Sequence, residues 1–142
     1  MLMGTYSHSL DAKGRLIVPA KIREELGERF YLSRNQDGCL SLYPESAWKE
    51  FVEKVEQLPK LSSEVARRLR RFYFGNSREM EIDKQGRILI PSDDRDFAGL
   101  SREITLVGVD DHAEIWDAEA WERYNTELDL ESLSYDLEGL NL

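Results

Sequence analysis

The chain has 142 residues, of which 41% are hydrophobic and 33% are charged, and its net charge at pH 7 is -9. This length allows one sizeable core, or two small units that share one, and the composition excludes a disordered or fibrous protein. Because no apolar run is as long as a transmembrane helix and the first residues lack a signal-peptide pattern, we expect a cytoplasmic protein that does not enter a membrane.

The first predicted unit opens with a strand, a turn and a second strand. A short strand is expected near residues 5–10, and the turn runs from Asp11 to Gly14. Aspartate at the first turn position accepts hydrogen bonds from backbone amides, and glycine at the last position can take a positive φ angle. The apolar residues 16–18 then favour a second short strand, which Pro19 ends.

A helix and a β-hairpin follow this opening. The proline can start a short helix over about residues 19–26, because the amide that proline lacks is not needed at a helix start. Two apolar stretches, residues 30–32 and 40–43, flank the turn-rich residues 35–38 and predict a hairpin. The single cysteine, Cys39, cannot form an internal disulfide, and we expect it to be a small buried side chain.

Two amphipathic helices are predicted after the hairpin. The first follows Pro44, and its apolar side chains at helical spacing indicate a buried stripe rather than a cofactor site. These side chains are Trp48, Phe51, Val52 and Val55. The second helix can be capped by Ser62 or Ser63. Its apolar face consists of Val65, Leu69, Phe72 and Tyr73, and its basic residues are Arg67, Arg68, Arg70 and Arg71.

The second half of the chain repeats the first. Residues 11–19 recur as residues 83–91 with aspartate, glycine, arginine and proline in register, and Arg23 matches Arg95. The repetition predicts a strand near residues 79–82 and a hairpin with strands at residues 104–107 and 113–116.

These patterns divide the chain into four segments. Two repeats, residues 5–47 and 76–119, are joined by a helical connector, residues 48–75, and followed by an acidic helix or tail, residues 120–142. A unit this short has too little core to be stable alone, so the repeats should pack as a pseudo-symmetric pair around one barrel-like core. The predicted fold class is α+β, rich in β-strands, with flanking helices.

The strand, Asp-x-x-Gly-Arg turn, apolar strand and proline-initiated helix resemble the AbrB-type (SpoVT-AbrB) swapped-hairpin domain. The tandem arrangement resembles the MraZ family of bacterial transcriptional regulators. The matching segments are residues 4–19, residues 83–91, and residues 106–108 followed by residues 114–117. The resemblance implies a double-split, swapped-hairpin β-barrel, assembly into a homo-oligomeric ring and association with the nucleoid. It also implies binding to repeated sites in double-stranded promoter DNA upstream of the division and cell-wall gene cluster, the protein's own operon.

The family's functional motif, Asp-x-x-x-Arg, corresponds to Asp11 with Arg15 and to Asp83 with Arg87. On physical grounds, the rigid fork of donors on arginine can pair with guanine O6 and N7 or with a phosphate. Aspartate cannot favourably face a phosphate, so Asp11 and Asp83 should hold the turns and orient the arginines. The simpler alternative is that both arginines only make salt bridges within their turns.

The residues around the two motifs differ in charge. Lys13 and Lys84 lie inside the turns, where we expect them to contact phosphates. After the first motif come Lys21 and Arg23, whereas the second is followed by Asp93, Asp94 and Asp96. The first loop is therefore expected to contribute more to DNA binding than the second.

The acidity of the chain is unevenly distributed. Residues 125–142 contain acidic side chains and no lysine or arginine, whereas basic residues outnumber acidic ones in residues 60–87. An acidic protein can therefore still have a basic face. The arginine-rich helix is an alternative DNA contact, although charge runs on helices are usually solvated faces, and Glu64 can pair with Arg68.

An enzyme is the second functional class to consider. Asp11 and Asp83 could form an acid–base pair, and His8 and His112 could be bases or metal ligands. Neither histidine has a second histidine or cysteine at metal-ligand spacing, so both are expected at the surface. Because the chain also lacks a glycine-rich phosphate loop and a nucleophile elbow, we expect no enzymatic activity, small-molecule substrate, metal or cofactor.

The third class is an AbrB-like antitoxin or another protein-binding module. Antitoxins of this kind use a tail to wrap a partner protein, and usually carry one unit per chain rather than two. The acidic tail here has the leucines that such an interaction would use. They are Leu128, Leu130, Leu133, Leu137 and Leu140.

Overall fold

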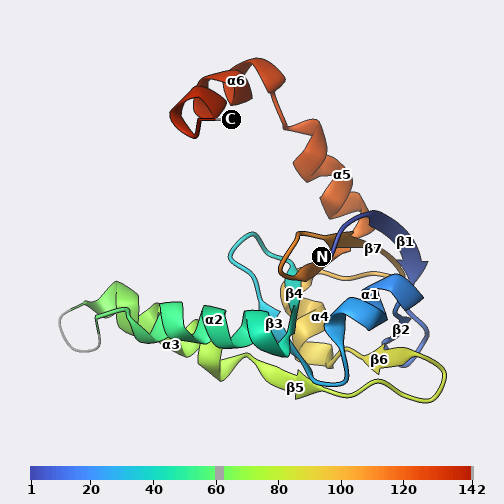
Figure 1. Cartoon of the computed structure of the whole chain (residues 1–142). Helices are drawn as coiled ribbons and strands as arrows, with labels where there is room; N and C mark the ends of the chain where they lie inside the picture. Colours follow the sequence, from blue (N-terminus) through green and yellow to red (C-terminus); the bar gives the residue numbers. More distant parts are fainter. Residues whose placement is uncertain (60–62, 142) are drawn as a thin grey trace.

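The computed structural model describes residues 1–59 and 63–141, and they form an α+β fold (Figure 1). The first half contains β1 (Thr5–Ser9), β2 (Arg15–Ile17), α1 (Ala20–Leu26), β3 (Phe30–Arg34), β4 (Leu40–Pro44), α2 (Glu45–Glu56) and α3 (Glu64–Gly75). The second half contains β5 (Arg78–Met80), β6 (Arg87–Leu89), α4 (Ser92–Ala98), β7 (Glu103–Gly108), β8 (Ala113–Asp117), α5 (Ala118–Thr126) and α6 (Leu130–Gly139). The predicted α+β class is confirmed.

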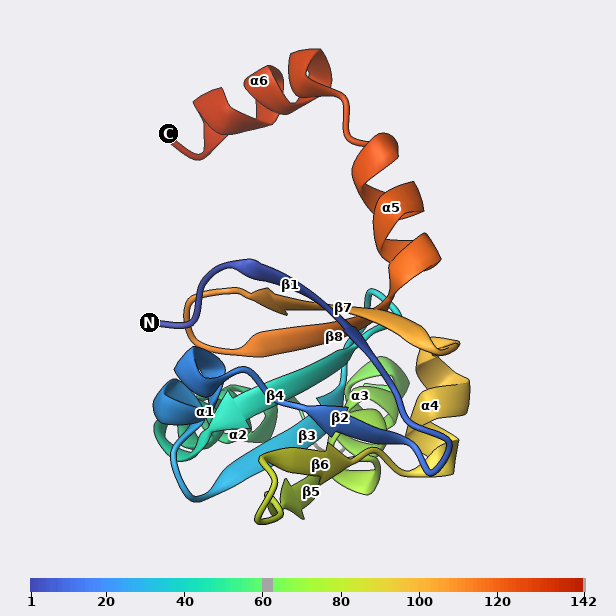
Figure 2. The same ribbon diagram turned by 90° about the vertical axis from the view of Figure 1, so that its right-hand side faces the viewer.

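The strands form one large and one small antiparallel sheet. The large sheet has the order β1-β7-β8-β4-β3-β5, and the small one pairs β2 with β6. Figure 2 shows the two-stranded β2–β6 ribbon lying across the larger sheet. Because β1 and β5 remain at the edges of the large sheet, the described strands do not close into a hydrogen-bonded barrel, which differs from the expected architecture.

Strand pairing crosses between the two halves of the chain. The strands β1 and β2 flank one turn, but β1 pairs with β7 and β2 with β6. Likewise, β5 pairs with β3 of the first half. The turn itself is tight, because the amide of Asp11 donates to the carbonyl of Arg15 at 3.0 Å, yet the strands diverge beyond it. Each diverging strand obtains its hydrogen-bonding partner from the other repeat.

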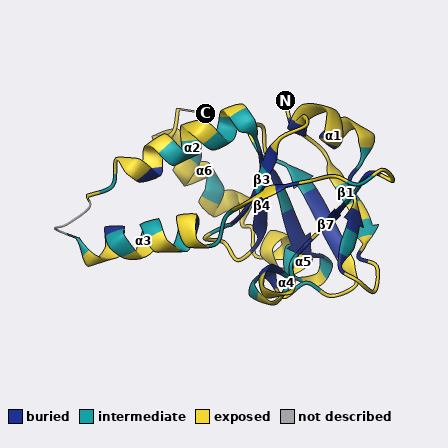
Figure 3. Ribbon diagram, turned by 90° about the horizontal axis from the view of Figure 1, so that it is seen from below, coloured by how far each residue is buried: buried dark blue, intermediate teal, exposed yellow. Residues whose placement is uncertain are grey.

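One hydrophobic core serves both halves. Leu16 on β2 and Ile88 on β6 are completely buried and face each other in the register of the ribbon. They belong to a single cluster that includes Leu32 and Leu42 of the first repeat and Ile115 of the second. Figure 3 shows that the buried residues are concentrated in the strands. The expectation of one core shared by both repeats is confirmed.

The local elements around the sheet follow the sequence patterns. Helix α1 begins after Pro19, although the proline is the N-cap rather than the first helical residue, and ends at Gly27 with φ 75°. The predicted hairpins are present as β3–β4 and β7–β8. Cys39 is completely buried, as expected, and burial raises the pKa of its thiol well above the usual range.

Helices α2 and α3 lie side by side and project from the sheet (Figure 1). The predicted stripe of α2 packs on β3 and β4: Trp48 stacks on Tyr31 with ring centroids 5.1 Å apart, and Phe51 stacks on Tyr43 at the same distance. On α3, Tyr73 is buried, whereas Val65, predicted to share its apolar face, is 68% exposed. Val65 lies in the first turn of this helix, where the body of the protein does not cover it.

The cap of α3 is Ser63, whose hydroxyl accepts a hydrogen bond from the amide of Ala66 at 3.2 Å. The alternative cap, Ser62, and Lys60 of the basic segment lie outside the described residues. At the other end of the chain, α5 and α6 extend away from the sheets (Figures 1 and 2). Helix α6 contains no buried residue. Of the helices in the described parts of the chain, none combines the length and apolar character needed to span a membrane.

Candidate functional site

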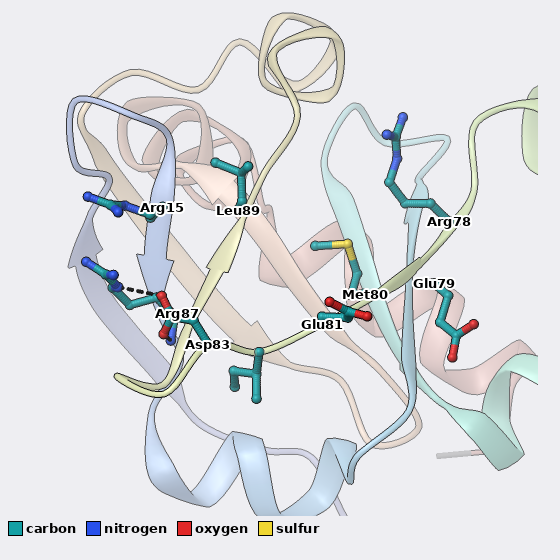
Figure 4. A pocket seen from close by; sticks show the side chains of 9 residues that line it. Arg15, Arg78, Glu79, Met80, Glu81, Asp83, Arg87 and Leu89 are labelled. Carbon is teal, nitrogen blue, oxygen red and sulfur yellow. Dashed lines mark hydrogen bonds and ion pairs between the residues drawn. The ribbon is translucent and has the colours of Figure 1, made fainter.

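The β2–β6 ribbon brings the two predicted motifs together. Its register pairs Arg15 with Leu89 and Ile17 with Arg87. Because side chains alternate along a strand, these four residues lie on the outer face, opposite the buried pair of Leu16 and Ile88. Figure 4 shows that the guanidinium groups of Arg15 and Arg87 extend toward the same side of the ribbon. The tertiary structure thus forms one surface from two motifs that lie far apart in the sequence.

Asp11 organises the first loop. Its Oδ1 accepts hydrogen bonds from the backbone N–H groups of Lys13 and Arg15, both at 2.9 Å. Its Oδ2 accepts a hydrogen bond from Nε of Arg15 at 2.6 Å. One carboxylate therefore closes the turn and fixes the direction of the arginine, as the sequence predicted. Arg15 Nε is used in this bond, whereas the terminal guanidinium nitrogens point outward (Figure 4).

Asp83 repeats this geometry in the second loop. Its Oδ1 accepts from the backbone N–H groups of Gln85 at 2.9 Å and Arg87 at 2.8 Å, and its Oδ2 accepts from Arg87 Nε at 2.8 Å. Arg87 has two further polar neighbours, because its Nη2 lies 3.4 Å from Oε1 of Gln85 and its Nη1 lies 4.0 Å from Oδ2 of Asp11. The second arginine is therefore more restrained than the first.

Both carboxylates are held in the charged form. Hydrogen bonds from the backbone and side chain of Arg15, opposed by partial desolvation, lower the pKa of Asp11 to about 2. The equivalent bonds from Arg87 lower the pKa of Asp83. A general acid that works near neutral pH needs a raised pKa, so these aspartates are poorly suited to the acid–base role considered above. Each carboxylate instead forms a formally neutral pair with its arginine.

Lys13 and Lys84 are exposed within the loops, where their ammonium groups add positive charge beside the paired aspartates and arginines. All six predicted site residues therefore lie in two loops joined by one ribbon. The sequence did not predict the rest of this surface. A hollow of about 600 Å³ lies beside β6, and its charged lining includes Arg78, Glu79 and Glu81 from the β5 region (Figure 4). These residues are brought there by the pairing of β5 with β3, for which the repeat pattern contains no signal.

Two of the three aspartates that follow the second motif are paired within the fold. Asp94 is completely buried, and its carboxylate pairs with Arg34 at 3.0 Å and Arg78 at 3.4 Å. Asp93 lies 3.5 Å from the same Arg34 and 3.6 Å from the same Arg78. These two carboxylates are therefore largely neutralised within the fold, rather than repelling a phosphate near Arg87.

The two histidines have different surroundings. His8 is half-buried on β1, and His112, contrary to expectation, has only 14% of its side chain exposed. Its ring nitrogens lie 2.7 Å from Asp111 and 2.9 Å from Glu114. Burial alone would lower the pKa of His112, but these two carboxylates raise it overall. In the described part of the chain, no group of three or more histidine, cysteine, aspartate or glutamate side chains is placed to hold a metal ion.

The arginine-rich helix α3 is partly committed to contacts within the protein. Arg68 pairs with Glu64 at 3.0 Å, as predicted from their spacing. Arg70 donates from Nη1 to the carbonyl of Val55 on α2 at 3.0 Å, and its guanidinium lies over the ring of Phe74. Helices α2 and α3 also project from the opposite side of the body to the ribbon (Figure 1). The ribbon is thus the better-formed candidate surface.

Comparison with known proteins shows which family each half of the chain resembles. A family model described as "MraZ protein, putative antitoxin-like" matches the chain twice, over residues 1–72 and 73–140. A protein from Thermoanaerobacter sp. (strain X514) called "Transcriptional regulator MraZ" is 46% identical over 144 residues, covering 100% of both chains. Proteins of the same name from Caldanaerobacter subterraneus subsp. tengcongensis and Clostridium acetobutylicum are 44% and 41% identical, again over 100% of both chains. Each half of the chain therefore corresponds to one family unit.

Proposed function

This chain belongs to the MraZ family, and on that basis we propose that it is a sequence-specific DNA-binding regulator of transcription. The observation that carries the proposal is the β2–β6 ribbon, which places Arg15 and Arg87 on one outer face. The major groove admits a two-stranded ribbon, and arginine is the side chain best suited to read guanine there. Lys13 and Lys84 neutralise phosphates beside the groove, while Asp11 and Asp83 orient the arginines.

The crossed strand pairing supports the finer assignment of the fold. We propose that it is the swapped-hairpin arrangement of AbrB-type domains, with residues 5–47 and 76–119 as the two repeats. In this arrangement the β2–β6 ribbon completes a barrel-like core through side-chain packing rather than through a continuous hydrogen-bond ladder. Residues 48–75 connect the repeats, and residues 120–142 form the acidic tail.

The active form in this proposal is a homo-oligomeric ring. The exposed apolar side chains on the projecting helices support assembly, because association between chains would remove them from water. They include Val65, Tyr124, Leu130, Tyr135 and Leu140, each at least 50% exposed. A ring presents several ribbons at once and therefore binds best where DNA offers repeated sites at matching spacing. The proposed targets are promoter repeats upstream of the division and cell-wall gene cluster, so the protein acts in the cytoplasm at the nucleoid, without enzymatic activity.

A mobility-shift assay with the promoter of the protein's own gene tests this function. The expected result is binding to a probe with several repeats, weaker binding to a single repeat and none to scrambled DNA. Because neutralised phosphates release counterions, affinity should also fall steeply as salt is raised. Arg15→Ala should weaken the shift, whereas Lys49→Ala is a matched control, since Lys49 is 72% exposed on α2 and pairs with Glu45. Equal affinity for promoter and scrambled DNA would refute sequence-specific binding.

A second candidate is an antitoxin-like module that binds a partner protein through its tail. The extended α6 with exposed Leu130 and Leu140 favours it, and so does the description of the family model. Capture of a small ribonuclease-like protein by the full chain, together with loss of capture when residues 127–142 are removed, would support this alternative. Retention of promoter DNA by the same truncated protein would assign the two activities to separate parts of the chain.

A further inference from the structure

Each motif loop is contacted by an arginine from the opposite repeat. Gly14 in the first loop has φ +83°, and a Cβ atom added there would lie 1.4 Å from Nη1 of Arg95 on α4. Gly86 in the second loop has φ +79°, and a Cβ there would lie 2.5 Å from Nη1 of Arg23 on α1. Both glycines are buried although they belong to surface turns. The space beside each glycine is thus occupied by a guanidinium group.

Arg95 is bonded to two different parts of the ribbon. Its Nη1 donates to the carbonyl of Lys13 at 3.2 Å and to the carbonyl of Ile90 at 2.9 Å. Lys13 lies in the first loop, whereas Ile90 lies directly after β6 of the second repeat. Hydrogen bonds from a charged donor are about twice as strong as neutral ones. Arg95 therefore ties the first loop to the strand on which Arg87 lies.

The backbone connects the loops in the same crossed manner. The amide of Ile90 donates to the carbonyl of Gly14 at 3.0 Å, and the amide of Val18 donates to the carbonyl of Gly86 at 2.9 Å. Each loop is thus joined to the strand end of the other repeat. At both glycines the guanidinium group fills the space that a Cβ atom would take, and the positive φ angle independently favours glycine.

We propose that Arg95 and Arg23 are positioning residues for DNA recognition, each holding the loop formed by the other repeat. Arg95 acts on the Asp11–Arg15 loop through its hydrogen bond to the carbonyl of Lys13, and Arg23 acts on the Asp83–Arg87 loop through its close approach to Gly86. This inference rests on the proposed DNA-binding function, and it assigns roles to two arginines outside the Asp-x-x-x-Arg motif. Neither repeat can present its loop correctly without the first helix of its partner repeat, so the two halves act as one recognition unit.

A positioning role differs from a direct contact in a measurable way. Nη1 of Arg95 donates hydrogen bonds to backbone carbonyls of the protein. Removal of this side chain should therefore loosen the first loop even in the absence of DNA. Limited trypsin digestion reports this, because Lys13 and Lys84 are cleavage points inside the two loops. Arg95→Ala should accelerate cleavage after Lys13 with little change after Lys84, and Arg23→Ala should do the reverse. Lys49→Ala should change neither rate.

A double-mutant cycle measured by DNA affinity is the second test. Arg95→Ala alone should weaken binding to the multi-repeat promoter about tenfold, the scale of one lost charge-assisted hydrogen bond. In the Arg15→Ala background, Arg95→Ala should raise the Kd by less than about twofold. The loop that Arg95 holds has then already lost the side chain that contacts DNA. Combined with Arg87→Ala, its effect should remain nearly complete. Conversely, Arg23→Ala should have little further effect in the Arg87→Ala background and nearly its complete effect in the Arg15→Ala background.

The outcomes separate this inference from the proposed function. If Arg15→Ala leaves DNA binding unchanged, the proposed site is wrong, while the trypsin rates still test the loop contacts. If Arg15→Ala weakens binding but Arg95→Ala changes neither cleavage nor affinity, the positioning role is refuted. A loss of affinity that adds fully to Arg15→Ala, without faster cleavage, would show instead that Arg95 touches DNA directly. If Arg95→Ala does not fold, Arg95→Lys can replace it, because lysine keeps the positive charge but lacks the planar guanidinium group. The same cleavage rates and the same double-mutant cycle then test the positioning role.

Discussion

Replacement of the two motif arginines should have unequal effects on DNA affinity. Arg15→Ala removes a guanidinium that is bonded to the carboxylate of Asp11, 2.6 Å away, and whose side chain is 32% exposed. Arg87 is 25% exposed and is held by Asp83 at 2.8 Å, with Gln85 and a second carboxylate, Asp11, also within 4.0 Å. Because Arg87 has more acceptors inside the protein, it has less capacity to pair with a base or a phosphate.

The size of the difference follows from the scale of arginine contacts. A guanidinium that contacts guanine with two hydrogen bonds contributes about 1–3 kcal/mol, or roughly 5- to 150-fold in Kd. We expect Arg15→Ala to fall within this range and Arg87→Ala to cost about 1 kcal/mol less, which is roughly a fivefold smaller loss. Asp93 and Asp94, which follow the second motif, add little to this difference, since they pair with Arg34 and Arg78.

The assay is a titration of each variant against the same multi-repeat promoter at fixed salt, with Lys49→Ala as the surface control. Light scattering and thermal unfolding should show that each variant keeps its assembly and stability, because a loop arginine on the outer face contributes little to the core. An equal or larger loss for Arg87→Ala would refute the reasoning that internal acceptors limit an arginine's contact with DNA.

Three other properties can be measured independently. Gly108→Ala should lower the free energy of unfolding in urea by about 1–3 kcal/mol, because its Cβ would lie 2.2 Å from the backbone nitrogen of Met3, and an unchanged midpoint would contradict this close approach. Asp11 has a folded pKa of about 2 against an ordinary value of 3.8, so its stabilisation is present above about pH 4 and is lost as the pH falls toward 2. Asp11→Asn should flatten that part of the pH–stability curve, and a curve identical to that of the unmodified protein would show that this carboxylate does not contribute. Light scattering at micromolar concentration should give a particle several times larger than the 16.5 kDa chain, whereas a monomer would exclude the ring.

The sequence by itself determined the local structure of the site. The repeated Asp-x-x-Gly-Arg turn predicted how Asp11 and Asp83 close their loops, because those hydrogen bonds join residues at most four positions apart. Amphipathic spacing likewise predicted the apolar stripe of α2, where Trp48 and Phe51 stack on Tyr31 and Tyr43. It failed for Val65, since spacing defines a face but not whether another element covers it.

Only the tertiary structure decided which strands pair and what surrounds the loops. A turn brings two strands near each other, but their hydrogen bonds go to whichever partners also allow the apolar faces to be buried. Here β2 pairs with β6, which places Arg15 and Arg87 on one ribbon and buries Leu16 against Ile88. The same crossing brings Arg95 to Gly14, a contact between residues far apart in the sequence. Such contacts depend on the packing of both repeats at once, and no local pattern of residues encodes them.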